Sequence, residues 1–426
     1  MAFPQNDALG LYLSIPFCRS KCTYCNFASG VYPASDHARY VDRLVEDMAA
    51  APAWAANMGV DLPRRVDTVY LGGGTPSLLA PELIARLFAA MREAFDFDAN
   101  AEITVECAPG QIAPETLAAL VAAGVNRVSL GVQSFIDREA HSSGRLHSRA
   151  IVEDDLSRLR AAGIANLNVD LIAGLAGQTF ASWEESLAVL AACTVPHASV
   201  YMFEVDEDSR LGRELLDGGT RYHAELVPTD DAMAQMYSTA IERLGQAGLE
   251  QYEISNFCRP GAASRHNLRY WHRRPYLGLG LDASSALFAL PLPAEGATRP
   301  AQDEEGYLLR TTTSDDLKEF LTGPQPLETA WLSPARQYEE AWFLGLRLNQ
   351  GVSLSALVRG FGPEPQPNAV KVVDQLVADN LLTSDGQTVR LTPRGQLLSN
   401  DVFQQFLGLD VEQTAAEGLS LEKAHD

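Results

Sequence analysis

Three cysteines near the start of the chain, Cys18, Cys22 and Cys25, are the residues whose types and spacing point most directly to chemistry. They fall within eight residues of a chain that holds six cysteines in all. Thiolates spaced in this way can face one small metal centre, and three protein ligands suit a cuboidal iron-sulfur cluster that leaves one iron open to a reactant. The spacing therefore predicts an iron-sulfur site.

Other interpretations of these cysteines stay open at the level of sequence. A tetrahedral zinc site would need a fourth Cys or His ligand, and none occurs within the ten residues after Cys25. A disulfide framework fits poorly with a long chain that shows no secretory signal, and incidental burial in a core is the remaining alternative. Cys107, Cys193 and Cys258 lack any such spacing, so we expect them to be ordinary buried thiols.

Glycine and polar residues follow the predicted strands where those strands end. A strand is predicted at Leu11–Ile15, which places the cysteines just past its carboxyl end. The next strand leads directly into Gly72–Pro76, where glycines allow a ligand to approach the backbone closely. Because parallel strands end at one edge, the polar groups there could build a single site, although each alone also fits a capping residue. These groups are Glu106, Gln133 and Asp170.

Composition restricts the class of protein. The chain has 426 residues, 46% of them hydrophobic, and a formal net charge of -22. It is long enough for two domains, and so large a negative charge argues against broad contacts with nucleic-acid phosphates or anionic lipids. No apolar run reaches the length of a membrane span, and no signal or transit pattern precedes the first strand. We therefore expect a cytoplasmic protein that binds no nucleic acid and is not an integral membrane protein.

Strand and helix patterns alternate from Leu11 to about Gly248. Runs rich in Val, Leu and Ile predict six strands, at Leu11–Ile15, Val66–Leu71, Ala101–Glu106, Arg127–Val132, Leu167–Ile172 and Ser199–Phe203. Helices are predicted between them, at Asp36–Ala51, Pro81–Phe95, Pro114–Ala123 and Thr179–Ala192, and in two segments that Ser148 and Thr229 can cap. Six such units with right-handed crossovers predict an α/β fold, an incomplete (β/α)6 barrel.

The alternation stops after Gly248. We expect an extended segment at Tyr252–Phe257 and a linker or exposed loop at residues 291–306, which are rich in Pro, Ala and acidic residues. Further on, helices, the short strand Thr388–Leu391 and a final helix at Arg394–Leu407 predict a small winged-helix-like α+β domain. Its many acidic residues favour a packing or lid role over DNA binding. The predicted divisions are a barrel at 1–250, a barrel extension at 251–322 and a C-terminal domain at 323–426.

The CxxxCxYC form of Cys18, Cys22 and Cys25, together with Gly72–Pro76, resembles the radical S-adenosylmethionine (SAM) superfamily. The resemblance implies that the cysteines hold a [4Fe-4S] cluster whose fourth iron chelates SAM, and that an electron from the cluster cleaves SAM to a 5′-deoxyadenosyl radical. Carboxylate, amide and guanidinium groups suit a zwitterion and a ribose. The SAM contacts that the resemblance implies are Tyr12, Tyr24, Phe27, Gly73, Gly74, Thr75, Glu106, Gln133, Arg145, Asp170 and Ser284.

Within that superfamily, nearly the whole chain resembles the oxygen-independent coproporphyrinogen III oxidase group, and most of all its HemW family of haem chaperones. His266–Trp271 matches the HNxxYW segment of that family. Phe27 stands where the oxidase has a further cysteine, and only ten residues precede the first strand, where the oxidase has an extension. Ser284 stands where relatives have a histidine, so we expect no mechanism that needs a second imidazole near SAM.

Arg265–Arg274 is a basic and aromatic island in an acidic protein. Its arginines could pair with the two propionates of a haem, and His266 or His272 could ligate the iron. Equally, Trp271 could pack in the core while the arginines balance the protein's own acids. The resemblance favours the haem interpretation, with His266 as the haem residue. We expect His141 and His147 at the surface or at the edge of the site.

The expected function is that of a haem chaperone, which binds haem, SAM and a [4Fe-4S] cluster and delivers haem to acceptor proteins, membrane-bound respiratory enzymes among them. A dimer that forms on cluster loading is a further expectation, which the sequence leaves open. Two alternatives are an oxidase that decarboxylates coproporphyrinogen III and a radical SAM methyltransferase on the same scaffold. No residue is assigned a catalytic role, and whether the chain is an enzyme stays open, with the oxidase activity not expected.

Overall fold

The computed structural model describes residues 7–290, 307–323, 328–362 and 367–409. The chain divides into two compact units, one that ends at Trp331 and one that begins at Leu332. The sequence suggested a division near residue 323. The structure divides the chain later because β12 (Glu328–Leu332) takes part in the large sheet of the first unit. Residues 291–306, the expected linker, lie outside the described residues.

A parallel sheet forms the core of the first unit. Each strand pairs in parallel with the next one along the chain, as βαβ connections require. The six predicted strands and their barrel-type order are thereby confirmed, and the third strand begins at Asp96 rather than at Ala101. The strands are β1 (Leu9–Ile15), β2 (Arg65–Gly73), β3 (Asp96–Cys107), β4 (Arg127–Gln133), β5 (Asn166–Ala173) and β6 (His197–Met202).

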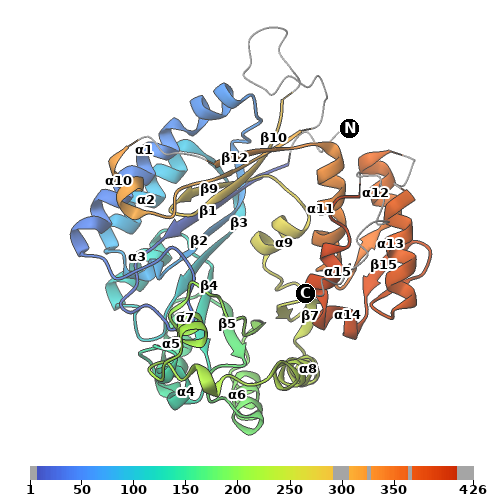
Figure 1. The fold of residues 1–426 in the computed structure, drawn as a ribbon. Helices are drawn as coiled ribbons and strands as arrows, with labels where there is room; N and C mark the ends of the chain where they lie inside the picture. The colour runs from blue at the N-terminus through green and yellow to red at the C-terminus, as the bar shows by residue number, and fades with distance from the viewer. Residues whose placement is uncertain (1–6, 291–306, 324–327, 363–366, 410–426) are drawn as a thin grey trace, which may run out of the picture. The chain divides into compact units, whose positions relative to one another are not determined.

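Helices connect these strands on the outer face of the curved sheet (Figure 1). They bury apolar stripes, as Tyr40, Leu44 and Met48 do on the first helix. That helix runs on through Pro52 to Met58, where a left-handed Gly59 ends it. The helices are α1 (Ala34–Met58), α2 (Pro81–Ala94), α3 (Pro114–Ala122), α4 (Asp137–Ser142), α5 (Arg149–Ala161), α6 (Phe180–Ala192), α7 (Arg210–Asp217) and α8 (Asp230–Gln246), with 3₁₀ turns η1 (Pro76–Leu78) and η2 (Ala224–Leu226).

Further strands extend the sheet at both edges. Next to β1 lies β9 (Tyr276–Gly280), also parallel, followed by the antiparallel β10 (Ser284–Phe288) and β11 (Leu308–Thr312), then β12. Beyond β6 lie β8 (Asn256–Cys258) and β7 (Glu250–Glu253). The segment predicted as extended at Tyr252–Phe257 is therefore a tight hairpin. A short helix, α10 (Leu317–Thr322), follows β11.

One more helix, α9 (Arg265–Trp271), lies on the inner side of the curved sheet (Figure 1). Its Arg269 is fully buried, and it donates to the carbonyl oxygens of Ala8 (2.7 Å) and Pro275 (2.8 Å) and pairs with Asp67. A Cβ at Gly10 would collide with the Arg269 side chain, so the glycine in β1 makes room for it. This ion pair ties α9 to the amino-terminal ends of β1 and β2.

The second unit has its own core and its own three-stranded sheet, with strand order β13-β15-β14. Trp342 stacks on Phe406 at 5.0 Å in that core. The predicted final helix is two helices, because Leu398 leaves helical geometry (φ −109°, ψ 29°). The elements are α11 (Pro334–Leu346), β13 (Val352–Ser353), α12 (Leu354–Phe361), α13 (Pro367–Ala378), β14 (Leu382–Ser384), β15 (Thr388–Leu391), α14 (Pro393–Leu397) and α15 (Ser399–Gln404).

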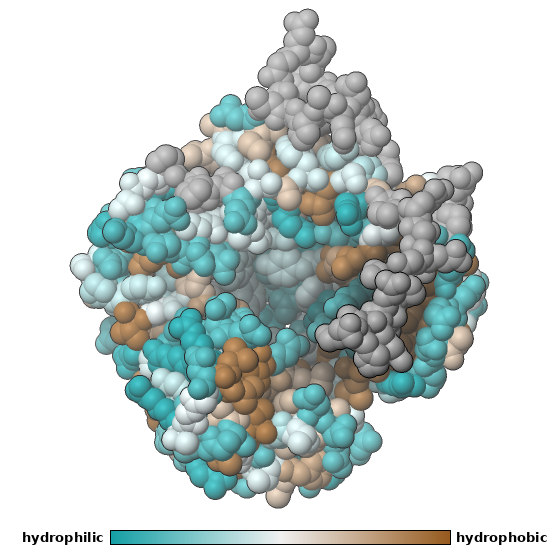
Figure 2. Space-filling model, viewed as in Figure 1, coloured by the Kyte–Doolittle hydropathy of each residue, from teal (hydrophilic) through white to brown (hydrophobic). Residues whose placement is uncertain are grey.

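The surface in view is mostly polar. Figure 2 shows a largely hydrophilic face on which hydrophobic side chains form separate patches. Among the described helices, none combines the length and the apolar character that a membrane span needs.

The Arg269–Asp67 pair gives a test of what holds α9. Replacing Arg269 with Met would leave a buried carboxylate and two carbonyl oxygens without this donor. We expect Arg269→Met to lower the free energy of unfolding by about 3 kcal/mol, measured by urea denaturation. Arg265 reaches the same carboxylate at 3.8 Å but is 42% exposed. Arg265→Met should therefore cost less than about 1 kcal/mol, and equal losses would contradict this account.

Candidate functional site

The loop that carries the three cysteines follows β1 and is fixed by backbone hydrogen bonds to other segments. The N–H of Cys18 donates to Gly30 (2.8 Å), and the N–H of Thr23 donates to Ser143 (3.1 Å). Thr23 in turn accepts a hydrogen bond from Leu211 in α7 (2.9 Å). Hydrogen bonds with Gly30, Ser143 and Leu211 thus hold the loop in place without a metal.

The glycine-rich loop after β2 runs directly against the cysteine loop. The N–H of Gly74 donates to Ile15 (2.9 Å), and the N–H of Thr75 donates to Phe17 (2.8 Å). A Cβ at Gly74 would lie 2.8 Å from the carbonyl oxygen of Ile15, so a larger residue cannot occupy this position. Gly73 has a φ of 94°, which also favours glycine.

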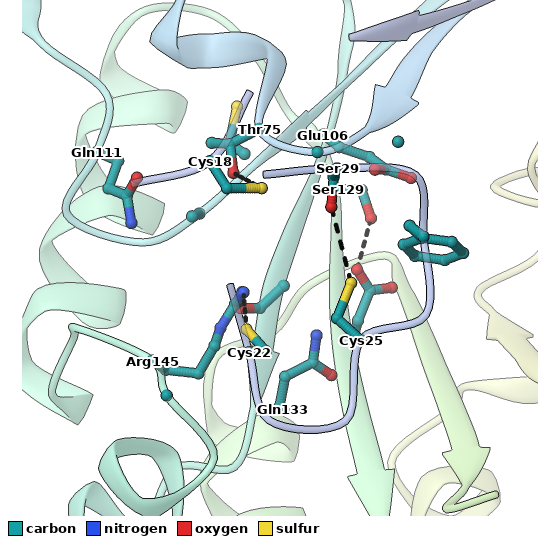
Figure 3. Close-up of a pocket in the computed structure, with 18 of the residues that line it drawn as sticks. Cys18, Cys22, Cys25, Ser29, Thr75, Glu106, Gln111, Ser129, Gln133 and Arg145 are labelled. Carbon is teal, nitrogen blue, oxygen red and sulfur yellow. Dashed lines mark hydrogen bonds between the residues drawn. The ribbon is translucent and has the colours of Figure 1, made fainter. Parts of the chain in front are cut away.

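Each cysteine sulfur lies near a hydrogen-bond donor from elsewhere in the chain. Thr75 Oγ1 lies 3.9 Å from Cys18 Sγ, and Arg145 Nη1 lies 3.5 Å from Cys22 Sγ. Ser29 Oγ lies 3.8 Å from Cys25 Sγ. Figure 3 shows the three sulfurs around a common space. Donors to sulfur stabilise thiolates and tune an iron-sulfur centre, so the loop is prepared for such a ligand. Sequence reasoning missed Ser29, because its contact depends on how the loop closes.

The number of thiols on this loop bears on the kind of metal centre. A structural zinc ion takes four ligands within about 2.3 Å, whereas a cubane cluster presents separate irons to separate thiolates and can leave one iron open. All six cysteines are free thiols. Three thiols on one loop suit a multi-iron cluster with one open iron.

A cavity of about 320 Å³ opens beside the thiols, inside the barrel. Its walls include the three cysteines and most of the side chains predicted to contact SAM. These residues are Tyr24, Phe27, Gly73, Gly74, Thr75, Glu106, Gln133, Arg145 and Asp170. The structure thus brings together residues that lie far apart in the sequence, on β2, β3, β4, β5 and three loops.

Two carboxylates face this cavity. Burial raises the pKa of Glu106 to about 7, and the nearby Asp170 carboxylate adds to the rise. The Tyr70 hydroxyl donates to Glu106 at 2.7 Å, and this hydrogen bond acts to lower the pKa of Glu106. Burial also raises the pKa of Asp170, which sits within β5 rather than at its end. Hydrogen bonds and the charge of Arg127 offset the rise in both pKa values only in part, so these two buried acids favour a ligand that carries cationic groups.

Several polar atoms on the cavity wall lack hydrogen-bond partners among the described residues. They are Gln111 Oε1, Gln133 Oε1, Arg127 Nε and His147 Nε2. Buried polar atoms are normally satisfied, so these atoms mark where a polar ligand would bind. His147, expected at the edge, lines the cavity, while His141 is exposed. Burial and the Arg145 charge lower the pKa of His147 to about 4.

Sequence reasoning missed several wall residues, and one available signal would have found them. Arg127, Ser129, Gly131 and Gln133 are alternate residues of β4, and all four line the cavity. Strand residues two apart share a face, so the position of Gln133 could have led to the other three. Asn168 likewise lies two residues before Asp170 on β5, and both line the cavity.

Two predicted SAM residues do not line the cavity. Tyr12 lies beneath it and stacks on Tyr70, with ring centroids 6.2 Å apart. Ser284 lies on β10, where its hydroxyl meets that of Thr312 at 3.1 Å. Because β9 and β1 separate β10 from the other barrel strands, the structure does not bring Ser284 to the site.

His266, the predicted haem residue, is buried with both ring nitrogens engaged. Nδ1 lies 3.0 Å from Thr68 Oγ1, and Nε2 lies 2.9 Å from the Tyr270 hydroxyl. Burial, with the charges of Arg269 and Arg127, lowers the pKa of His266 to about 3, so the ring is neutral. In this arrangement the imidazole offers no free nitrogen to an iron.

The arginines of the same segment pair with the protein's own acids. Arg265, Arg269 and Arg274 all approach Asp67, and Arg274 also pairs with Asp7. These pairs agree with the interpretation in which the arginines of the basic island balance the protein's own acids. Asn267 of α9, by contrast, lines the cavity; it belongs to the HNxxYW segment, but no role was predicted for it.

Comparison with known proteins agrees with this architecture. A model of the radical SAM superfamily matches residues 12–190, and a model of the HemN C-terminal domain matches residues 332–398. The solved structure of coproporphyrinogen III oxidase (HemN) from Escherichia coli superimposes with a TM-score of 0.77 at 22% identity, covering 94% of this chain and 90% of that one. The predicted fold class is thereby confirmed.

Relatives of known name cover almost the whole chain. The haem chaperone HemW of Lactococcus lactis subsp. lactis is 31% identical over 400 residues, which are 94% of this chain and 97% of that protein. The mitochondrial radical S-adenosyl methionine domain-containing protein 1 of Bos taurus is 34% identical over 352 residues, 82% of this chain and 75% of that protein. With such identity over nearly its full length, the chain belongs to the HemW family.

Proposed function

We propose that this protein is a haem chaperone that binds a [4Fe-4S] cluster, SAM and haem and passes haem to acceptor proteins. The relatives named haem chaperone HemW support the haem part, because they match 94% and 93% of this chain. The observation that carries the cofactor part is the convergence of three thiols, each with a donor, on a cavity lined by unsatisfied polar atoms and two buried acids.

The residues on the wall fit the proposed cofactors. Cys18, Cys22 and Cys25 would each hold one iron, and the cluster would supply an open iron for SAM and one electron for its cleavage. Glu106 and Asp170 would face the cationic groups of SAM, namely its ammonium and its sulfonium. The remaining polar wall residues would bind its carboxylate, its ribose hydroxyls and its adenine, and they include Gln133, Arg145 and the backbone of Gly73 and Gly74.

Haem itself needs apolar contacts, and two exposed apolar side chains on the cavity wall could supply them. Phe27 and Leu146 both line the cavity and are 60% and 57% exposed. Exposed apolar side chains at the rim of a polar site commonly mark a binding surface. As an iron ligand, His266 would have to give up its hydrogen bonds to Thr68 and Tyr270. We propose that ligation by His266 accompanies a movement of α9.

The wider setting follows from the same proposal. The haem acceptors would be haemoproteins, membrane-bound respiratory enzymes included, and the protein would act in the cytoplasm. Cluster loading would promote a dimer. Conversion of coproporphyrinogen III under anaerobic, reducing conditions would contradict a chaperone-only role, whereas cleavage of SAM alone would not.

The raised pKa of Glu106 gives a test of SAM binding. A SAM cation favours the ionised carboxylate, and below pH about 7 binding must first expel a proton from Glu106. We expect the Kd for SAM, measured by anaerobic equilibrium dialysis with the oxidised cluster, to rise up to about tenfold per pH unit as the pH falls from 7 to 6. Asp170, whose pKa is also raised, acts in the same direction.

The matched control for this test is Glu106→Gln. Without the titrating group, binding should be weaker at pH 8 and should change much less between pH 7 and pH 6. His147 stays neutral throughout this range, because its pKa is about 4. A Kd in the wild type that is constant between pH 8 and pH 6 would show that Glu106 does not meet the cation.

The contacts of His266 suggest one variant that should weaken haem binding and one that should strengthen it. His266→Ala removes the proposed ligand and should weaken haem binding about tenfold, read from the Soret band during titration. Tyr270→Phe removes the hydroxyl that lies 2.9 Å from Nε2 and so frees the nitrogen. It should strengthen binding about fivefold, because one hydrogen bond no longer has to be broken. If neither variant changes the affinity, His266 is a packing residue.

A further inference from the structure

A chain of buried hydrogen bonds runs away from Asp170 on the side opposite the thiols. It begins at Asn168, continues through His197 on β6 and Tyr252 on β7, and ends at the backbone of Ser264, which caps α9. Asn168 and His197 are 2% and 0% exposed. Nothing in the proposed binding of cluster, SAM or haem uses His197 or Tyr252.

The charge on Asp170 fixes the direction of every bond in this chain. An ionised carboxylate only accepts, so the Asn168 amide must turn its nitrogen to Asp170 Oδ1 at 2.7 Å. Its oxygen then faces His197 Nδ1 at 2.6 Å, and that nitrogen must carry the proton. His197 Nε2 is left as an acceptor, so the Tyr252 hydroxyl donates to it at 2.9 Å. The Tyr252 oxygen accepts the N–H of Ser264 at 3.3 Å.

The surroundings hold His197 in this neutral form. Burial and the charge of Arg127 keep the pKa of His197 well below its usual range. The ring lies against Tyr252, with centroids 5.6 Å apart. Ser129 adds a second donor to Asp170, at 3.0 Å from Oδ2, and the same serine accepts from Asn168. Both carboxylate oxygens therefore depend on the orientation of one amide.

We propose that His197, supported by Tyr252, is a positioning residue that sets the Asp170 carboxylate for SAM through Asn168. Without the N–H of His197, the Asn168 oxygen keeps only the longer hydrogen bond from Ser199 Oγ, at 3.3 Å. The amide can then rotate and present its oxygen to Asp170, which would repel the carboxylate and displace it. The inference rests on the proposed binding of SAM by Asp170. It adds two residues that touch neither SAM nor the cluster.

The test measures SAM binding by anaerobic titration calorimetry on the full chain with a complete cluster. His197→Leu removes the donor and should raise the Kd about tenfold. His197→Asn keeps an N–H near the place of Nδ1 and should stay within about twofold of the wild type. Tyr252→Phe keeps the fold and the imidazole but removes the donor to Nε2, and should raise the Kd about threefold. Cluster absorbance and circular dichroism verify that each variant is folded and loaded.

Tyr237→Phe is the matched control. Tyr237 is also buried and donates to the Ile254 carbonyl oxygen in the turn between β7 and β8, outside the chain to Asp170. It should leave the Kd unchanged. A loss equal to that of Tyr252→Phe would show that any disturbance of the hairpin weakens binding, and would overturn the proposal.

A double-mutant cycle with Asp170→Asn completes the experiment. If His197 acts through Asp170, His197→Leu should have little further effect in the Asp170→Asn background. An undiminished tenfold loss there, or a loss in His197→Asn as large as in His197→Leu, would overturn the positioning role. Wild type that carries a complete cluster but binds no SAM would overturn the proposed function and this role with it. Normal wild-type binding with unchanged affinity in His197→Leu and Tyr252→Phe would overturn this role alone.

Discussion

Two carboxylates buried in one cavity are the constraint on which the site depends. Burial raises the pKa of both Glu106 and Asp170, and the charge of Asp170 adds to the rise at Glu106. The fold tolerates them because hydroxyl and amide groups donate to both, from Tyr70, Ser129 and Asn168. These dipoles orient the acids without cancelling their charge, so a cationic ligand still gains from binding.

A third buried acid shows the opposite arrangement within the same barrel. Asp67 has three arginines around it, Arg265, Arg269 and Arg274, and lies outside the cavity. A buried charge that is fully paired stabilises the geometry of the fold, and its carboxylate has nothing left to offer a ligand. Asp67 and Glu106 therefore differ by a physical criterion, the presence of a direct cationic partner, which supports the proposal that Glu106 and not Asp67 binds a cation.

The sequence predicted what depends on local pattern. The six parallel strands, the loop of three cysteines and the polar residues Glu106 and Gln133 follow from apolar runs, from spacing and from the rule that polar residues gather at strand ends. Other cavity residues, such as Tyr24 and Arg145, were expected only from the family resemblance. It did not predict contacts made across strands, such as Asn168 with His197. The pattern of each strand shows which residues face inward, but not which residue of the neighbouring strand each one meets. It also missed local breaks, such as the turn that makes Glu250–Cys258 a hairpin, which depend on pairing with β6.

The family resemblance suggests His266 as a haem residue, whereas the structure shows it as a packed side chain. The contacts of α9 explain how both roles are compatible. In this structure the ring is neutral, stacks on Tyr70 at 5.3 Å and meets Thr68 and Tyr270, so α9 is packed as a structural helix. Tyr70 in turn donates to Glu106, and the cap of α9 reaches Asp170 through Tyr252 and His197. Two routes thus lead from α9 to the two binding acids. A ligand that moves α9 must disturb both acids, and by thermodynamic linkage a ligand held by those acids must resist the movement of α9.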